Sequence, residues 1–299
     1  MVTRDMPPTT LTLTVSLADL DFARTKSVGI FNLSLGLVEQ LSRRPELSRP
    51  TVLANREHHP QSVSALEQAY FVRRFWGTVR HARVIFTISD FTTGEILRQA
   101  KARGLTPPPV HTIGIGFNRP AASPGPRENR IVVLASPFPQ KRTALAVDWL
   151  TRWQRETVFT GVVDWIGRAP ADLNWPTCRN WRRHERLPEA DYRALLARAR
   201  ALVFFTDYEG FGMPPVEASL VGACPVFSAV PATREVMGGC GYGFNNRDYE
   251  SFRVALDSAL AVSRAQVAAW AEQLLARHHW GLVTGRIVAG LQAARPQCP

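Results

Sequence analysis

Two glutamates, Glu209 and Glu217, lie in the segment YEGFGMPPVE at residues 208–217. Two glycines between them, Gly210 and Gly212, permit a tight turn and let backbone N–H groups approach a ligand closely. The prolines that follow suit the start of a helix, because a missing N–H costs little there. Such a helix points free N–H groups and its positive dipole end at the loop, which makes an anion site. The segment therefore predicts an anion cradle flanked by two hydroxyl acceptors, as a nucleoside-diphosphate sugar requires.

The same segment closely resembles the E-x7-E signature of retaining glycosyltransferases of family 4. An apolar run, ALVFF at residues 201–205, precedes it, and residues 222–239 look like the strand and loop that follow in the family. The resemblance implies an α/β protein of the GT-B fold, with two Rossmann-like domains built on parallel sheets. It also implies that Glu209 lies by the donor sugar and that Glu217 binds the ribose. The donor would further contact the residues between the first glutamate and the helix, which are Gly210, Phe211, Gly212 and Met213.

Three other positions resemble donor-binding residues of this family. Lys141, in ASPFPQKRTAL, resembles the lysine whose ammonium offsets the diphosphate charge as the glycosidic bond breaks, and Arg142 adjoins it. Gly29 matches the glycine loop of the first domain, and Gly167 matches the glycine near which the base docks. A tight turn at Gly29 and a plain strand end at Gly167 are the alternative interpretations.

The region between residues 54 and 63 is short compared with the family, which has several further strands and helices there. This spacing predicts a reduced N-terminal domain. His58 and His59 lie in the short region, where the family often places a histidine close to the donor sugar. They could contact the sugar or the acceptor, or form an exposed loop pair. In the family this half carries the acceptor site, so a catalytically silent relative that acts as a binding subunit is the alternative function.

Apolar β-rich runs alternate with amphipathic stretches, which predicts parallel sheets covered by helices. We expect strands at 11–15, 51–54, 84–88, 110–115, 131–135, 161–166, 201–205 and 225–228. We expect helices at 30–41, 63–79, 91–103, 143–153, 189–198, from 214, and at 249–261, 264–275 and 280–293. A stretch rich in Pro, Ser and Gly, residues 121–129, is typical of a linker. The predicted domains are 1–120 on the acceptor side and 121–285 for the nucleotide sugar, with a helix at 286–299 packing back toward the first.

The chain of 299 residues is strongly basic, with 36 Lys and Arg against 25 Asp and Glu, which favours anionic partners. Its arginine pairs are scattered and no nucleic-acid-binding module is recognisable, so we expect no nucleic-acid partner. The four cysteines show no C-x-x-C spacing, which indicates neither a zinc site nor a disulfide framework. We expect no cofactor and no metal, because no Asp-x-Asp motif stands beside the donor signature.

The N-terminus, MVTRDMPPTT, lacks the apolar core of a signal peptide, and no run approaches the ~20 apolar residues of a membrane span. We therefore expect a cytoplasmic protein, at most peripheral at the inner face of the membrane.

The resemblance to family 4, together with the residue pattern, implies a retaining, metal-independent glycosyltransferase. It would move a hexose from a nucleotide-diphosphate sugar to a hydroxyl acceptor, a sugar or a lipid-linked glycan, in bacterial polysaccharide, lipopolysaccharide or other glycoconjugate biosynthesis. An enzyme of similar architecture, such as a phosphorylase or an epimerase, is disfavoured because no pyridoxal lysine motif is evident.

Overall fold

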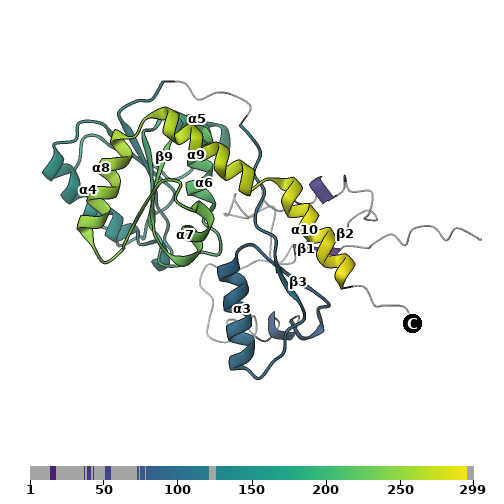
Figure 1. The fold of residues 1–299 in the computed structure, drawn as a ribbon. Coiled ribbons are helices and arrows are strands. Elements are labelled where there is room, and N and C mark those ends of the chain that lie inside the picture. Colours follow the sequence, from purple (N-terminus) through teal and green to yellow (C-terminus); the bar gives the residue numbers. More distant parts are fainter. Residues whose placement is uncertain are drawn as a thin grey trace, which may run out of the picture. The chain divides into compact units, whose positions relative to one another are not determined.

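The computed structural model describes residues 79–120 and 126–294, the strands at 14–17 and 51–54, and residues 37, 39–41, 43, 73 and 75–77. The chain divides into two compact units (Figure 1). One unit comprises residues 1–117 together with 278–299, and the other comprises residues 118–277.

The unit 118–277 is built on a six-stranded parallel sheet with the strand order β10-β9-β8-β5-β6-β7. The strands are β5 (Arg130–Leu134), β6 (Val162–Ile166), β7 (Trp181–His184), β8 (Ala201–Phe204), β9 (Cys224–Ser228) and β10 (Tyr242–Phe244). The chain starts in the middle at β5, runs outward to β7, and then returns to the other side of β5. The order therefore reverses between β5 and β8, and ligands of open α/β sheets bind beyond the carboxyl ends of the strands at such a point.

Helices cover both faces of this sheet (Figure 1). They are α4 (Thr143–Thr157), α5 (Glu189–Arg198), α6 (Met213–Val221), α7 (Pro231–Met237), α8 (Tyr249–Ala261) and α9 (Arg264–Arg277). In β5, Ile131 and Val133 are buried in the core that contains α4 and α8, whereas Val132 is buried in the core that contains α5 and α6. Because both faces are covered, the strands read as continuous apolar runs rather than as alternating ones.

The other unit contains two short pairs of parallel strands, β1 (Thr14–Leu17) with β2 (Thr51–Ala54) and β3 (Ile85–Thr87) with β4 (Val110–Thr112). Helix α3 (Asp90–Ala102) follows β3, and the Ser89 hydroxyl caps it by accepting the Thr92 N–H at 3.0 Å. Helix α10 (Trp280–Ala293) belongs to the same unit, where Trp280, Val283 and Ile287 share a core with Ile113.

The predicted class, α/β with parallel sheets, is confirmed, and so are most of the predicted elements within a few residues. Four elements were missed: the 3-10 helix η1 (Pro139–Lys141), the edge strand β7, the short helix α7 and the short strand β10. Strand β7 carries two exposed arginines, Arg182 and Arg183, so it shows no apolar run. The predicted helices at 30–41 and 63–79 lie mostly outside the described residues. Among the helices that the structure describes, none has the length and apolar character needed to cross a membrane.

Candidate active site

The loops after β5 and β8, residues 135–142 and 205–212, flank the point where the strand order reverses. Two of the predicted catalytic residues meet there, because the Lys141 Nζ forms an ion pair with the Glu209 Oε1. Their side chains are 27% and 16% exposed, so a ligand can reach both. The backbone ties the loops together as well, since the Asp207 N–H donates to the Gln140 carbonyl at 2.7 Å.

A second ion pair runs beside the first, between the Arg142 Nε and the Asp207 Oδ2 at 3.2 Å. Arg142 has φ 50° and ψ 34°, a left-handed conformation that is uncommon for a residue other than glycine. This reversal of the chain lets two consecutive cations reach two acidic residues of the neighbouring loop. Asp207 also accepts the Asn246 amide at 2.9 Å, which links the pair to the end of β10.

The pair between Lys141 and Glu209 is partly exposed, so we expect it to contribute no more than about 1 kcal/mol to folding. The Lys141 Nζ also lies 5.0 Å from the centroid of the Phe204 ring. Both groups are therefore held in place but are available to exchange partners with a ligand.

The glycine loop leads directly into α6. Gly212 precedes the helix with φ 88°, and a Cβ there would lie 2.8 Å from Thr233 Cγ2. The helix begins at Met213, so Pro214 and Pro215 occupy its second and third positions rather than the first. Because proline has no N–H, the first turn offers fewer donors than the sequence pattern suggests. An anion here would depend on the loop N–H groups, the Met213 N–H and the helix dipole.

Glu217 is the fifth residue of α6, one position beyond its first turn, and it interacts electrostatically with Arg193 and Glu189 of α5. Burial raises the pKa of its carboxyl, the nearby Arg193 opposes this effect, and Glu189 adds to it. Burial and the charge of Glu217 likewise raise the pKa of the Tyr192 hydroxyl. The carboxyl is thus placed where a hydrogen-bond donor from a ligand would stabilise its charged form.

Gly167 ends β6 with φ 107°, and a Cβ there would lie 2.2 Å from the Ala135 carbonyl oxygen. Its N–H donates to the His184 carbonyl at 2.9 Å. Packing between the ends of neighbouring strands therefore accounts for glycine at this position, and the predicted docking of the base beside it stays a prediction. The remaining predicted residues, Gly29, His58 and His59, lie outside the described residues.

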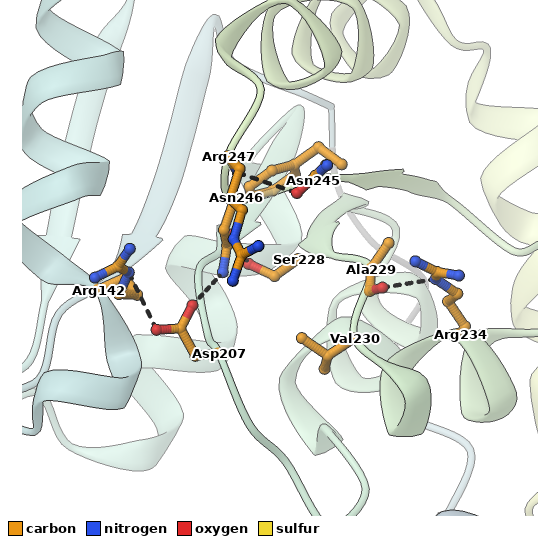
Figure 2. A pocket seen from close by; sticks show the side chains of 10 residues that line it. Arg142, Asp207, Ser228, Ala229, Val230, Arg234, Asn245, Asn246 and Arg247 are labelled. Atoms are coloured by element: carbon orange, nitrogen blue, oxygen red, sulfur yellow. Dashed lines mark hydrogen bonds and ion pairs between the residues drawn. The ribbon is translucent and has the colours of Figure 1, made fainter.

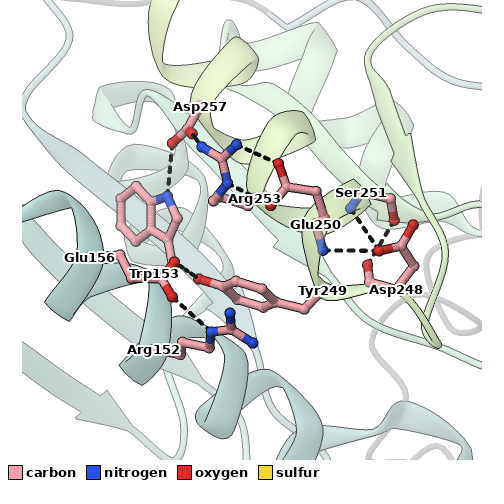
Figure 3. A network of polar contacts seen from close by, with 9 residues as sticks. All are labelled: Arg152, Trp153, Glu156, Asp248, Tyr249, Glu250, Ser251, Arg253 and Asp257. Atoms are coloured by element: carbon pink, nitrogen blue, oxygen red, sulfur yellow. Dashed lines mark hydrogen bonds and ion pairs between the residues drawn. The ribbon is translucent and has the colours of Figure 1, made fainter.

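The structure adds polar residues that the sequence analysis missed. The Ser228 hydroxyl donates to the Asn246 amide oxygen at 2.6 Å, and the Asn246 amide nitrogen donates to the Thr206 carbonyl at 2.7 Å. These side chains, together with Arg142 and Asp207, line a pocket of about 450 Å³ (Figure 2). The available signal was their position, since Ser228 ends β9 and Asn246 lies two residues after β10, at the carboxyl edge of the sheet. Within residues 79–120 and 126–294, no three His, Cys, Asp or Glu side chains are grouped to hold a metal ion.

No protein-family profile matches the sequence, and no curated protein matches it. Solved structures do match. The α,α-trehalose-phosphate synthase (UDP-forming) of Burkholderia vietnamiensis superposes with a TM-score of 0.59 at 13% identity, over 74% of this chain and 62% of that one. The sucrose-phosphate synthase of Thermosynechococcus elongatus gives a TM-score of 0.59 at 17% identity, over 79% of this chain and 65% of that one.

The pneumococcal O-GlcNAc transferase GtfA, solved with UDP and GlcNAc, gives a TM-score of 0.57 at 14% identity, over 83% of this chain and 53% of that one. This chain thus spans between half and two thirds of the length of these three proteins. The similarities identify the fold of the chain as that of the GT-B glycosyltransferases.

Proposed function

We propose that this chain is a retaining glycosyltransferase that moves a hexose from a nucleotide-diphosphate sugar to a hydroxyl acceptor. The observation that carries the proposal is the ion pair between Lys141 and Glu209 where the strand order reverses, beside a glycine loop that opens a helix. The GT-B fold of the structural neighbours supports it, as do the UDP bound to GtfA and the UDP-forming reaction of the trehalose-phosphate synthase.

The ion pair suggests how the donor would engage the site. A diphosphate carries more negative charge than one carboxylate, so it would draw the Lys141 ammonium away from Glu209. The freed carboxylate could then accept hydrogen bonds from hydroxyls of the donor sugar. Once the donor is bound, the Lys141 ammonium and the loop N–H groups would stabilise the growing charge of the leaving group without further reorganisation, which is usually the largest catalytic contribution.

Retention and metal independence rest on the resemblance to family 4. In the proposed reaction the bond from the anomeric carbon to the phosphate oxygen breaks, and the acceptor oxygen bonds to that carbon on the same face. The acceptor proton passes to the departing phosphate. Glu217 would hold the ribose. Lys141 would supply the positive charge that a divalent cation supplies in metal-dependent transferases.

Metal independence has a direct test. Turnover should persist after exhaustive treatment with EDTA, because the diphosphate is neutralised by Lys141 and N–H donors. The measurement is product formation before and after chelation, with Mn²⁺ and Mg²⁺ added back. A rate that collapses with chelator and returns with manganese would contradict the proposed mechanism.

The proposed biological setting rests on the resemblance to family 4 and on the charge of the chain. Synthesis of a bacterial polysaccharide, lipopolysaccharide or other glycoconjugate in the cytoplasm fits a family 4 transferase. A net charge of +11 fits peripheral contact with an anionic membrane face. The short stretch between residues 54 and 63 favours the alternative, a silent relative that binds a nucleotide sugar without turning it over.

A panel of nucleotide diphosphates and nucleotide sugars separates these functions. Thermal shift and calorimetry on the full chain measure binding, and product formation with a set of glycan acceptors measures turnover. Binding with turnover that Glu209→Gln abolishes supports the enzyme. Binding without turnover supports the silent relative, and the absence of any nucleotide binding contradicts both.

A further inference from the structure

A pocket of about 450 Å³ lies at the carboxyl edge of the sheet, on the β9 and β10 side of the point where the strand order reverses. Arg142 and Asp207 form one wall, Ser228 and Asn246 contribute another, and Arg234 of α7 and Arg247 after β10 complete it (Figure 2). Gly167, beside which the base is predicted to dock, lies on the opposite side, at the end of β6. The pocket therefore adjoins the ion pair between Lys141 and Glu209 but extends away from the predicted position of the base.

The charge of the pocket lining is unbalanced. Three arginines and one aspartate are the ionised residues among those that line it. The aspartate already pairs with Arg142 and accepts a hydrogen bond from Asn246. Arg234 uses only its Nε, which donates to the Ala229 carbonyl at 2.6 Å, and no acidic partner of Arg234 or Arg247 is found among the described residues.

The side chains of Ser228 and Asn246, and the side-chain oxygen of Asn245, already have hydrogen-bond partners. The Ser228 hydroxyl accepts the Thr206 N–H at 2.9 Å and donates to Asn246, and the Asn245 side chain accepts the Arg247 N–H at 3.0 Å. A ligand would therefore find few free neutral partners on these walls. Recognition would come from the guanidinium groups, which bind phosphate through paired N–H donors.

We propose that this pocket binds the phosphate group of a second ligand, distinct from the diphosphate of the donor. The excess of two positive charges on the lining matches the nearly two negative charges of a phosphate monoester at pH 7. The phosphate could belong to a phosphorylated acceptor or be free inorganic phosphate. Phosphate binding at this pocket is measured without a donor and without a turnover assay. A negative result would therefore contradict this proposal and leave the proposed function untouched.

The test measures binding to the full chain by calorimetry, at constant ionic strength and without any donor. The probes are inorganic phosphate, a hexose 6-phosphate and the unphosphorylated hexose. The variants are Arg247→Gln, the double variant Arg234→Gln with Arg247→Gln, and Arg234→Lys, which keeps the charge. Arg155→Gln, an exposed arginine in the last turn of α4, is the matched control, and Lys141→Ala reports on the donor side.

We expect at least one phosphate probe to bind and the unphosphorylated hexose not to bind. Arg247→Gln should weaken binding about tenfold, the scale of one charged hydrogen-bond partner, and the double variant by more. Arg155→Gln and Lys141→Ala should leave it unchanged. Tighter binding of the hexose phosphate would identify a phosphorylated substrate, and equal binding would identify free phosphate. If neither phosphate probe binds, or if Arg247→Gln and the double variant bind phosphate as the wild type does, the proposal is wrong.

Discussion

Replacing Lys141 should separate an effect on turnover from an effect on donor affinity. The diphosphate gains negative charge only as the glycosidic bond breaks, so a cation beside it stabilises the transition state more than the ground state. Lys141→Ala should therefore lower turnover by about 10²–10³ while reducing donor affinity much less. Steady-state kinetics and calorimetry on the same preparation measure both quantities.

The structure supplies the controls for this prediction. Lys101→Ala, in the last turn of α3, removes a lysine outside the site and should leave turnover unchanged. Lys141→Arg should restore activity only in part, because a planar guanidinium meets phosphate differently from a compact ammonium. Near-normal turnover in Lys141→Ala would transfer the role to Arg142, its neighbour in the second ion pair.

Replacing Glu217 by glutamine should stabilise the folded protein at pH 7 but weaken nucleotide binding. Burial raises the pKa of this carboxyl in the folded state, so the folded protein binds its proton more tightly than the unfolded chain does. Stability is then lost as the pH rises from about 4.5, the unperturbed value, through the folded pKa. Glu217→Gln should remove this loss and raise the melting temperature at pH 7, while weakening nucleotide binding by roughly 1–3 kcal/mol.

Melting curves of both proteins between pH 4 and pH 8 and nucleotide titrations at pH 7 check the Glu217 prediction. The difference in melting temperature should shrink toward the acid end, where the carboxyl is mostly protonated in both states. Unchanged nucleotide affinity in the folded variant would mean that Glu217 does not contact the ribose.

The sequence motifs predicted Lys141 and Glu209 on two separate loops, and the structure brings these two side chains together, while their catalytic roles stay a prediction. The motifs could not select Asp207 or Asn246. Their roles depend on the left-handed turn at Arg142 and on the hydrogen bond from β10, and neither leaves a periodic signal.

The junction between the ends of β5 and β6 depends on one glycine. Gly167→Ala would place a Cβ 2.2 Å from the Ala135 carbonyl and would hold a non-glycine residue at φ 107°. We expect a loss of about 2–3 kcal/mol in the free energy of unfolding of this unit. Denaturant melts of the two proteins measure it.

A glycine in an open helix position provides the contrast. Gly94 lies inside α3, and no atom lies within 4 Å of the Cβ that would be added there. Gly94→Ala should therefore stabilise its own unit by roughly 0.5–1 kcal/mol. If Gly167→Ala raises the free energy of unfolding as Gly94→Ala is expected to do, the added Cβ does not clash with the Ala135 carbonyl and this prediction is wrong.

Elements could be predicted from the sequence where burial imposes a pattern on them. β5 and β8 are buried on both faces and were evident as apolar runs, and α4 was evident from its periodicity. β7 was missed because an edge strand with one neighbour can carry exposed arginines. β10 was missed because it has three residues within a glycine-rich stretch, where a parallel strand is recognised only by its pairing with β9.

At the scale of the whole molecule, the chain divides into two units, and we expect a nucleotide to slow amide exchange mainly in the unit 118–277. Three of the proposed donor groups, Lys141, Glu209 and Glu217, belong to the unit 118–277. A nucleoside diphosphate at 100 times its dissociation constant stabilises the state that binds it by about 2.7 kcal/mol. That energy should appear as slower amide exchange in the loops 135–142 and 205–212.

Hydrogen exchange read by mass spectrometry on the full chain, with and without a nucleoside diphosphate that binds, measures this effect. Helix α3 has its own cap and belongs to the other unit, so its exchange should not change and it serves as the internal control. In Lys141→Ala the protection of the loop 205–212 should persist at saturating nucleotide, because the glycine loop and α6 still hold the phosphates. Protection confined to α3 and β4, with both loops unchanged, would place the nucleotide elsewhere and contradict the donor site proposed at the reversal of strand order.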